Sequence, residues 1–159
     1  MNAKALELEK GIREKNCGVS ANNRCLFRED FSVQVASSGC PEIQALIAGA
    51  TIPRSLLPIQ KPPLQQITSV LHRRAELRHP VNTLHVLAHG RPGAFRFGDQ
   101  WIDAESLKAH ANELASWGVD TIALWSCSTS ADQDFISVLE ELTGSTIWAS
   151  DQALGQLKD

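Results

Sequence analysis

The sequence lacks both a long apolar run and an excess of basic charge. It contains no run of 18 consecutive apolar residues, so we expect no membrane-spanning helix. The formal net charge is -3 at pH 7, whereas a nucleic-acid-binding domain needs a strong basic patch that displaces counterions from the phosphates. These absences exclude a membrane span and argue against a nucleic-acid partner.

Metal-binding and secretion signals are missing as well. The cysteines form no CxxC pair and no Cys/His pair at zinc spacing, and they are too few for a disulfide scaffold: Cys17, Cys25, Cys40 and Cys127. The N-terminal stretch MNAKALELEKGIREKN mixes Lys and Glu without an apolar core and does not resemble a signal peptide. We expect no bound metal and, for the sequence as given, a cytoplasmic protein, while secretion as part of a longer parent protein stays open.

The motifs of two other enzyme classes are absent. No G-x-G-x-x-G motif follows a strand pattern, so we expect no dinucleotide and no other cofactor. No G-x-S-x-G nucleophile elbow occurs either, which excludes a lipase-like α/β-hydrolase.

Strand and helix patterns alternate from residue 31 onward. Residues 1–30 differ and are expected to form an N-terminal extension, with a short helix at 3–15 and a loop at 16–25. Strand patterns occupy 31–35, 54–59, 83–88, 121–125 and 145–150, helix patterns occupy 41–50, 61–76, 103–118 and 131–144, and a hairpin is expected at 94–102. Such alternation predicts one α/β domain over residues 31–159, with a mostly parallel sheet.

Two apolar strand patterns each continue into residues that can carry chemistry. The segment 83–88 is followed by His89-Gly90, and the segment 121–125 is followed by Ser126-Cys127. In open α/β sheets the ligand site lies beyond the carboxyl ends of the strands, and neighbouring strands lie about 5 Å apart. Cys127 could then act as nucleophile and His89 as acid/base. The alternative is that Cys127 is a small apolar side chain and that His89-Gly90 only ends its strand. The dipole of the helix expected at 131–144 would favour the thiolate.

Residues beside this pair are candidates for binding the substrate. The amides of Gly90 and Cys127 could form an oxyanion hole. Arg91 could bind a carboxylate through its bidentate fork, with plain surface exposure as the alternative. Ser126 and Ser128 flank the cysteine and could contact the substrate.

The last expected strand also ends in polar residues. Ser150 and Asp151 could line the same cleft, where Asp151 could select a basic substrate residue or orient His89. A solvated loop acid or a helix cap is the alternative for Asp151. His85 lies within its strand, and we expect it to be a core histidine with its hydrogen bonds satisfied.

Two motifs carry a family resemblance. HVLAHGRPG followed by IALWSC resembles the caspase–gingipain–legumain superfamily of cysteine peptidases. More closely, residues from about 31 to 156 are similar to an uncharacterised bacterial domain family often found in giant, repeat-rich adhesin-like proteins. The matching motifs are Ala88-His89-Gly90 with Gly93, Phe97-Gly98, Trp125-Ser126-Cys127, Leu142-Thr143-Gly144, Ala149-Ser150-Asp151 and Gly155.

This resemblance implies a fold and two functional hypotheses. The fold is a caspase-like three-layer α/β/α sandwich with a flavodoxin-like strand order. The first hypothesis is a cysteine peptidase-like domain with a His89/Cys127 dyad that acts on a peptide or protein, in limited or self-directed processing. The second is a catalytically silent module that serves as an interaction or structural subunit of a larger assembly. Ser126 departs from the family pattern, which usually has Gly before the cysteine.

Overall fold

The computed structural model describes residues 31–38, 43, 53–58 and 60–149, together with two short N-terminal strands. These strands, β1 (Gly18–Val19) and β2 (Cys25–Leu26), pair antiparallel where the sequence indicates a loop. The helix expected at 3–15 lies outside the described residues. Of the helix expected at 41–50, only Ile43 is described, and it is helical and buried.

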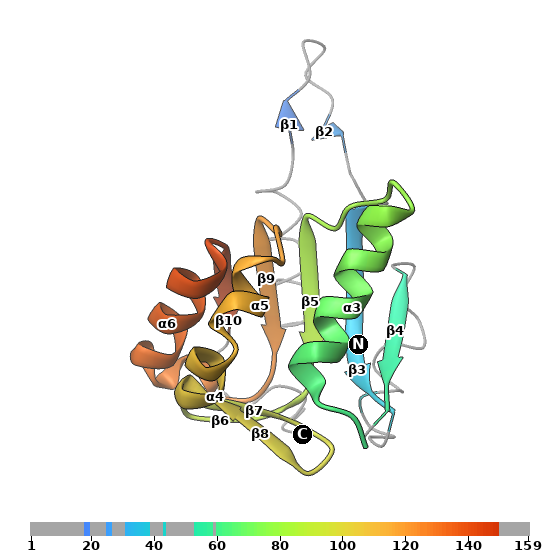
Figure 1. Ribbon diagram of the computed structural model, residues 1–159. Coiled ribbons are helices and arrows are strands. Elements are labelled where there is room, and N and C mark those ends of the chain that lie inside the picture. The colour runs from blue at the N-terminus through green and yellow to red at the C-terminus, as the bar shows by residue number, and fades with distance from the viewer. Residues whose placement is uncertain are drawn as a thin grey trace, which may run out of the picture.

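Five parallel strands form the main sheet (Figure 1). They are β3 (Ser32–Ser37), β4 (Arg54–Leu57), β5 (Thr83–Leu87), β9 (Thr121–Trp125) and β10 (Thr146–Ala149). Their order across the sheet is β10-β9-β5-β3-β4. Numbered along the chain this is 2-1-3-4-5, the doubly wound order of flavodoxin-like sheets. The expected parallel sheet and its strand order are confirmed.

The described helices cover one face of this sheet, as Figure 1 shows. They are α3 (Pro63–Glu76), α4 (Ala104–Ala109), α5 (Ala111–Ala115) and α6 (Gln133–Thr143), with a 3₁₀ turn, η2 (Thr129–Ala131), before α6. Alternate strand residues such as Val35, Leu84 and Leu124 meet the apolar sides of the helices in the main core. A second cluster contains Leu87 and Ile43, so the sheet is apolar on both faces.

The helix expected at 103–118 is divided into α4 and α5. Asp103, the first residue of that pattern, caps α4, because its Oδ1 accepts a hydrogen bond from the Ser106 amide at 2.9 Å. The break falls at His110, whose ring Nδ1–H donates to the Ser106 carbonyl at 2.8 Å. In a continuous helix the His110 amide would donate to this same Ser106 carbonyl. Here the His110 amide donates to the Leu107 carbonyl instead, at 3.0 Å.

A small antiparallel sheet follows β5 and lies beside the carboxyl ends of the main strands (Figure 1). Its strands are β6 (His89–Arg91), β7 (Ala94–Phe97) and β8 (Gln100–Asp103). The expected hairpin corresponds to β7 and β8, and β6 adds a third strand. Phe95 faces the core and packs edge-to-face with Phe135, with 6.1 Å between ring centroids. The inner face of the small sheet therefore attaches it to the domain.

Candidate active site

His89 and Cys127 follow two neighbouring strands at equivalent positions. Strands β5 and β9 are paired in parallel, and Leu87 lies opposite Trp125 at the last paired position. His89 and Cys127 each come two residues later. The Ala88 amide donates to the Trp125 carbonyl at 3.4 Å, which extends the contact between the chains past the strand ends. Both side chains are half-buried.

Gly90 packs against the backbone of the cysteine segment. A Cβ placed on Gly90 would lie 2.7 Å from both the Cys127 amide nitrogen and Thr129 Oγ1, and closer still to the Cys127 carbonyl oxygen. Only a residue without a side chain fits there. The two groups expected to form an oxyanion hole, the Gly90 and Cys127 amides, therefore belong to segments in direct contact.

The chain turns sharply straight after Cys127. Ser128 has a left-handed backbone with φ of 54°, a conformation that costs about 1 kcal/mol or more for a residue other than glycine. The turn brings Thr129 back so that its Oγ1 lies 2.5 Å from Ser126 Oγ. Thr129 Oγ1 also donates to the Ala94 carbonyl at 3.4 Å, and both hydroxyl side chains are buried.

Thr129 is a residue whose importance the sequence analysis missed. The run Ser128-Thr129-Ser130 has the composition of a solvated loop, and nothing in its local pattern indicates a buried hydroxyl. The structure shows that Thr129 links the cysteine segment to the small sheet, since the Gly93 amide also donates to its carbonyl at 3.3 Å.

The helix after the cysteine starts later than expected and carries acidic residues at its start. Helix α6 begins at Gln133 rather than near 131. Asp132 Oδ1 accepts from the amides of Asp134 and Phe135, at 3.0 and 3.4 Å. A carboxylate at this end offsets the positive end of the helix dipole. The Asp132 carboxylate works against the support that the helix dipole could give to a Cys127 thiolate, and that support stays a prediction.

The remaining candidates for binding the substrate are placed as follows. Arg91 is exposed, and its guanidinium carbon lies 4.1 Å from the centre of the Trp101 ring. Ser126 is buried and Ser128 is half-buried. Ser150 and Asp151 lie outside the described residues.

His85 is a buried histidine with a defined proton position. Trp125 Nε1–H donates to His85 Nδ1 at 3.0 Å, so Nε2 carries the proton of the neutral ring. Burial lowers the pKa of His85 from 6.5 to about 4. The expectation of a core histidine is confirmed, and its hydrogen bond anchors Trp125, the residue two positions before Cys127.

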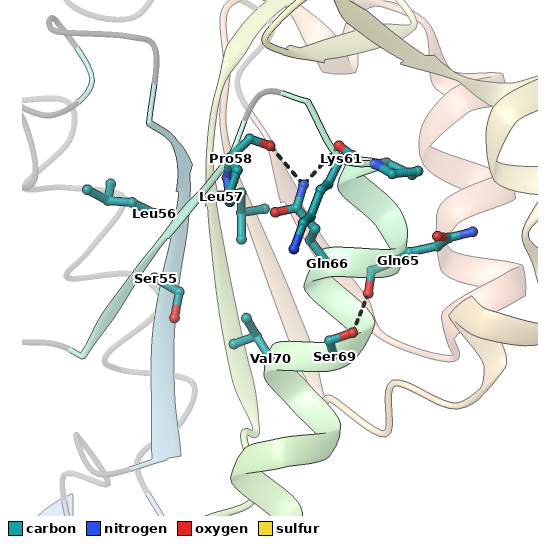
Figure 2. A pocket seen from close by; sticks show the side chains of 10 residues that line it. Ser55, Leu56, Leu57, Pro58, Lys61, Gln65, Gln66, Ser69 and Val70 are labelled. Carbon is teal, nitrogen blue, oxygen red and sulfur yellow. Dashed lines mark hydrogen bonds between the residues drawn. The ribbon is translucent and has the colours of Figure 1, made fainter.

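The cavity drawn in Figure 2 lies between β4 and α3, and His89 and Cys127 do not line it. It has a volume of about 530 Å³. Gln66 Nε2 closes one end by donating to the carbonyls of Pro58 and Lys61, at 3.0 and 2.9 Å (Figure 2). Its lining contains no nucleophile paired with a base, so we assign it no chemistry.

Two further properties concern the part of the chain that the structure describes. Within it, no three or more His, Cys, Asp or Glu side chains gather in a way that could hold a metal ion. None of its helices has the length and apolar character needed to cross a bilayer.

The molecule is thus an α/β domain in which a histidine and a cysteine follow adjacent parallel strands. A protein-family model, described as Domain of unknown function (DUF4347), matches residues 33–159. The match covers most of the chain, and the chain belongs to this family. The uncharacterised domain family that the motifs indicated is confirmed to this extent. Comparisons with curated proteins and with solved structures found no match.

Proposed function

We propose that this domain is a cysteine peptidase-like domain with a caspase-like fold, in which Cys127 is the nucleophile and His89 the acid/base. One observation carries the proposal: the two residues stand at equivalent positions after paired strands, with Gly90 packed against the Cys127 backbone. The carboxyl edge of a doubly wound sheet is where such folds bind their ligands.

The proposed reaction uses the side chains in two steps. The Cys127 thiolate attacks the carbonyl carbon of a peptide bond, and the imidazolium of His89 gives its proton to the leaving amine. Water then attacks the resulting thioester while His89 takes one of its protons, and the carboxylic acid product leaves as the Cys127 thiolate and the His89 imidazolium are restored. The amides of Gly90 and Cys127 would stabilise the oxyanion in both steps. The substrate would be a peptide segment, in the same chain or in another protein.

Alkylation of the cysteines tests the dyad directly. Iodoacetamide modification is followed by mass spectrometry over a range of pH, in the wild type and in His89→Ala. An ordinary thiol loses its proton near pH 8.5, so an activated Cys127 should react roughly tenfold faster than Cys17, Cys25 and Cys40 at about pH 6. His89→Ala should remove this advantage.

A second histidine variant serves as the control, since it shows whether removal of any histidine changes the alkylation rate of Cys127. His72 is an exposed residue of α3, and His72→Ala should leave the reactivity of Cys127 unchanged. If Cys127 reacts like the other cysteines and His89→Ala changes nothing, the peptidase proposal fails. The catalytically silent interaction module is then the function to pursue.

A further inference from the structure

The outer face of the small sheet carries His89 together with a cluster of cationic and aromatic side chains. His89 pairs with Arg96 across β6 and β7, and Arg96 pairs with Trp101 across β7 and β8. Residues directly opposite one another in antiparallel strands point to the same face. Arg91 lies two positions after His89 and so shares that face. We call the surface formed by Arg91, Arg96 and Trp101 the arginine face.

Both arginines of this face stack on one indole ring. The guanidinium carbon of Arg91 lies 4.1 Å from the centroid of Trp101, and that of Arg96 lies 5.5 Å away. Arg91 reaches Trp101 across the middle strand, where the small residue Ala94 stands opposite Arg91. Stacking on an aromatic ring fixes a guanidinium while its N–H donors stay available at its edge.

No acid forms an ion pair with the arginine face within the described part of the chain. There, the guanidinium groups of Arg91 and Arg96 make neither an ion pair nor a hydrogen bond, while their backbones belong to the paired strands. Asp103 stands in the same row as Arg91, but its Oδ1 accepts from the amide and the hydroxyl of Ser106, both at 2.9 Å. Two guanidinium groups held against one ring, neither of them in an ion pair, favour an anion that offers paired oxygens.

We propose that the arginine face binds acidic side chains of a peptide segment and so sets the substrate preference beside His89. Carboxylates match the guanidinium fork, and the apolar ring of Trp101 supplies contact area that a free inorganic anion would not use. The direct pairing of His89 with Arg96 brings a bound acidic residue next to the proposed acid/base. The role in substrate choice rests on the proposed function, whereas the binding itself does not.

Binding is measured on the full chain carrying Cys127→Ala, so that no turnover occurs. The probes are two fluorescent libraries of short peptides with acetylated and amidated ends, identical except that fixed Glu residues in one are Gln in the other. Fluorescence polarisation should show roughly tenfold tighter binding of the Glu library at low salt, weakening as salt is raised. In the double variant Arg91→Gln with Arg96→Gln, the affinity for the Glu library should fall to the affinity for the Gln library.

Charge reversal and a distant arginine supply the decisive comparisons. Arg91→Glu with Arg96→Glu should invert the preference toward a Lys-containing library, provided that circular dichroism shows an unchanged fold. Arg73→Gln, an exposed position on α3, should leave the preference intact. Equal binding of the Glu and Gln libraries by the wild-type surface overturns the proposal. So does an oligonucleotide that competes as well as the Glu library.

The outcomes of the two proposals can be told apart. An inert Cys127 together with a Glu preference that depends on Arg91 and Arg96 rejects the peptidase and retains the acidic-peptide surface. An activated Cys127 without a Glu preference retains the peptidase and rejects the acidic-peptide surface.

Discussion

Gly90 lies directly against the backbone of Cys127, so the segment that carries His89 and the segment that carries Cys127 meet with no side chain between them. Residues on neighbouring parallel strands are usually separated by the strand spacing of about 4.8 Å and by the side chains at the strand ends. Because Gly90 has no side chain, the backbones that carry His89 and Cys127 can pack directly against each other, which fixes the position of one segment relative to the other.

Gly90→Ala should therefore disturb the cysteine segment. The new methyl group would lie under 3.0 Å from backbone atoms of Cys127, and overpacking of this kind costs about 1–3 kcal/mol. We expect a lower free energy of unfolding in urea together with a changed alkylation rate of Cys127. Gly118→Ala is the matched control, because Gly118 has φ of 62° and open space around it. That variant should lose about 1 kcal/mol of stability and leave Cys127 unaffected. If Gly90→Ala and Gly118→Ala change the alkylation rate of Cys127 equally, direct packing of Gly90 against the Cys127 backbone is contradicted.

Thr129→Val should show that the Ser126–Thr129 contact is a coupled pair. The replacement keeps the shape of the buried side chain and leaves Ser126 Oγ without its partner, at a cost of about 1–3 kcal/mol. The double variant with Ser126→Ala should lose less than the sum of the two single variants, since no hydroxyl is then left unpaired. Urea unfolding of the four proteins measures this coupling, and simple additivity would refute it.

His85 should make stability depend on pH in the mildly acidic range. The pKa of His85 is lowered to about 4 in the folded protein, against 6.5 for an ordinary histidine, so the unfolded chain binds the extra proton first. Stability from this group is complete above about pH 6.5 and falls by roughly 3 kcal/mol as the pH is lowered to about 4. His85→Gln should flatten this fall in a series of urea titrations, whereas His72→Gln at an exposed position should not. A wild-type profile that matches the His85→Gln profile would rule out a buried neutral ring.

The sequence was most informative where a pattern is repeated over several residues. The nearly continuous apolar runs that became β5 and β9 predicted buried parallel strands, and their order along the chain predicted which side chains follow them. Capping residues at the ends of the helix patterns were less uniform guides: Asp103 caps α4 and Gly144 caps α6, whereas Gly118 lies beyond α5, which ends at Ala115.

Features that depend on one side chain or on distant contacts were missed. At the break, the His110 ring donates a hydrogen bond to the Ser106 carbonyl. Helix propensities of single residues do not predict such a side-chain-to-backbone bond. The left-handed backbone of Ser128 could not be predicted from its residue type, because Gly or Asn usually occupies this conformation. Strand β6 contains only His89, Gly90 and Arg91, and its pairing with β7 decides which residues share the face of His89.

The three short strands of the small sheet bring the proposed acid/base and the proposed peptide-binding surface into one contiguous piece of chain. Residues 89–103 contain the proposed acid/base and the whole arginine face, and their inner side is fixed to the core by Phe95. Under the proposed function, substitution of this cassette, residues 89–103 between β5 and α4, would exchange substrate choice and proton transfer together. Variation among related domains in this cassette would change what is bound while the parallel sheet and the cysteine strand stay the same.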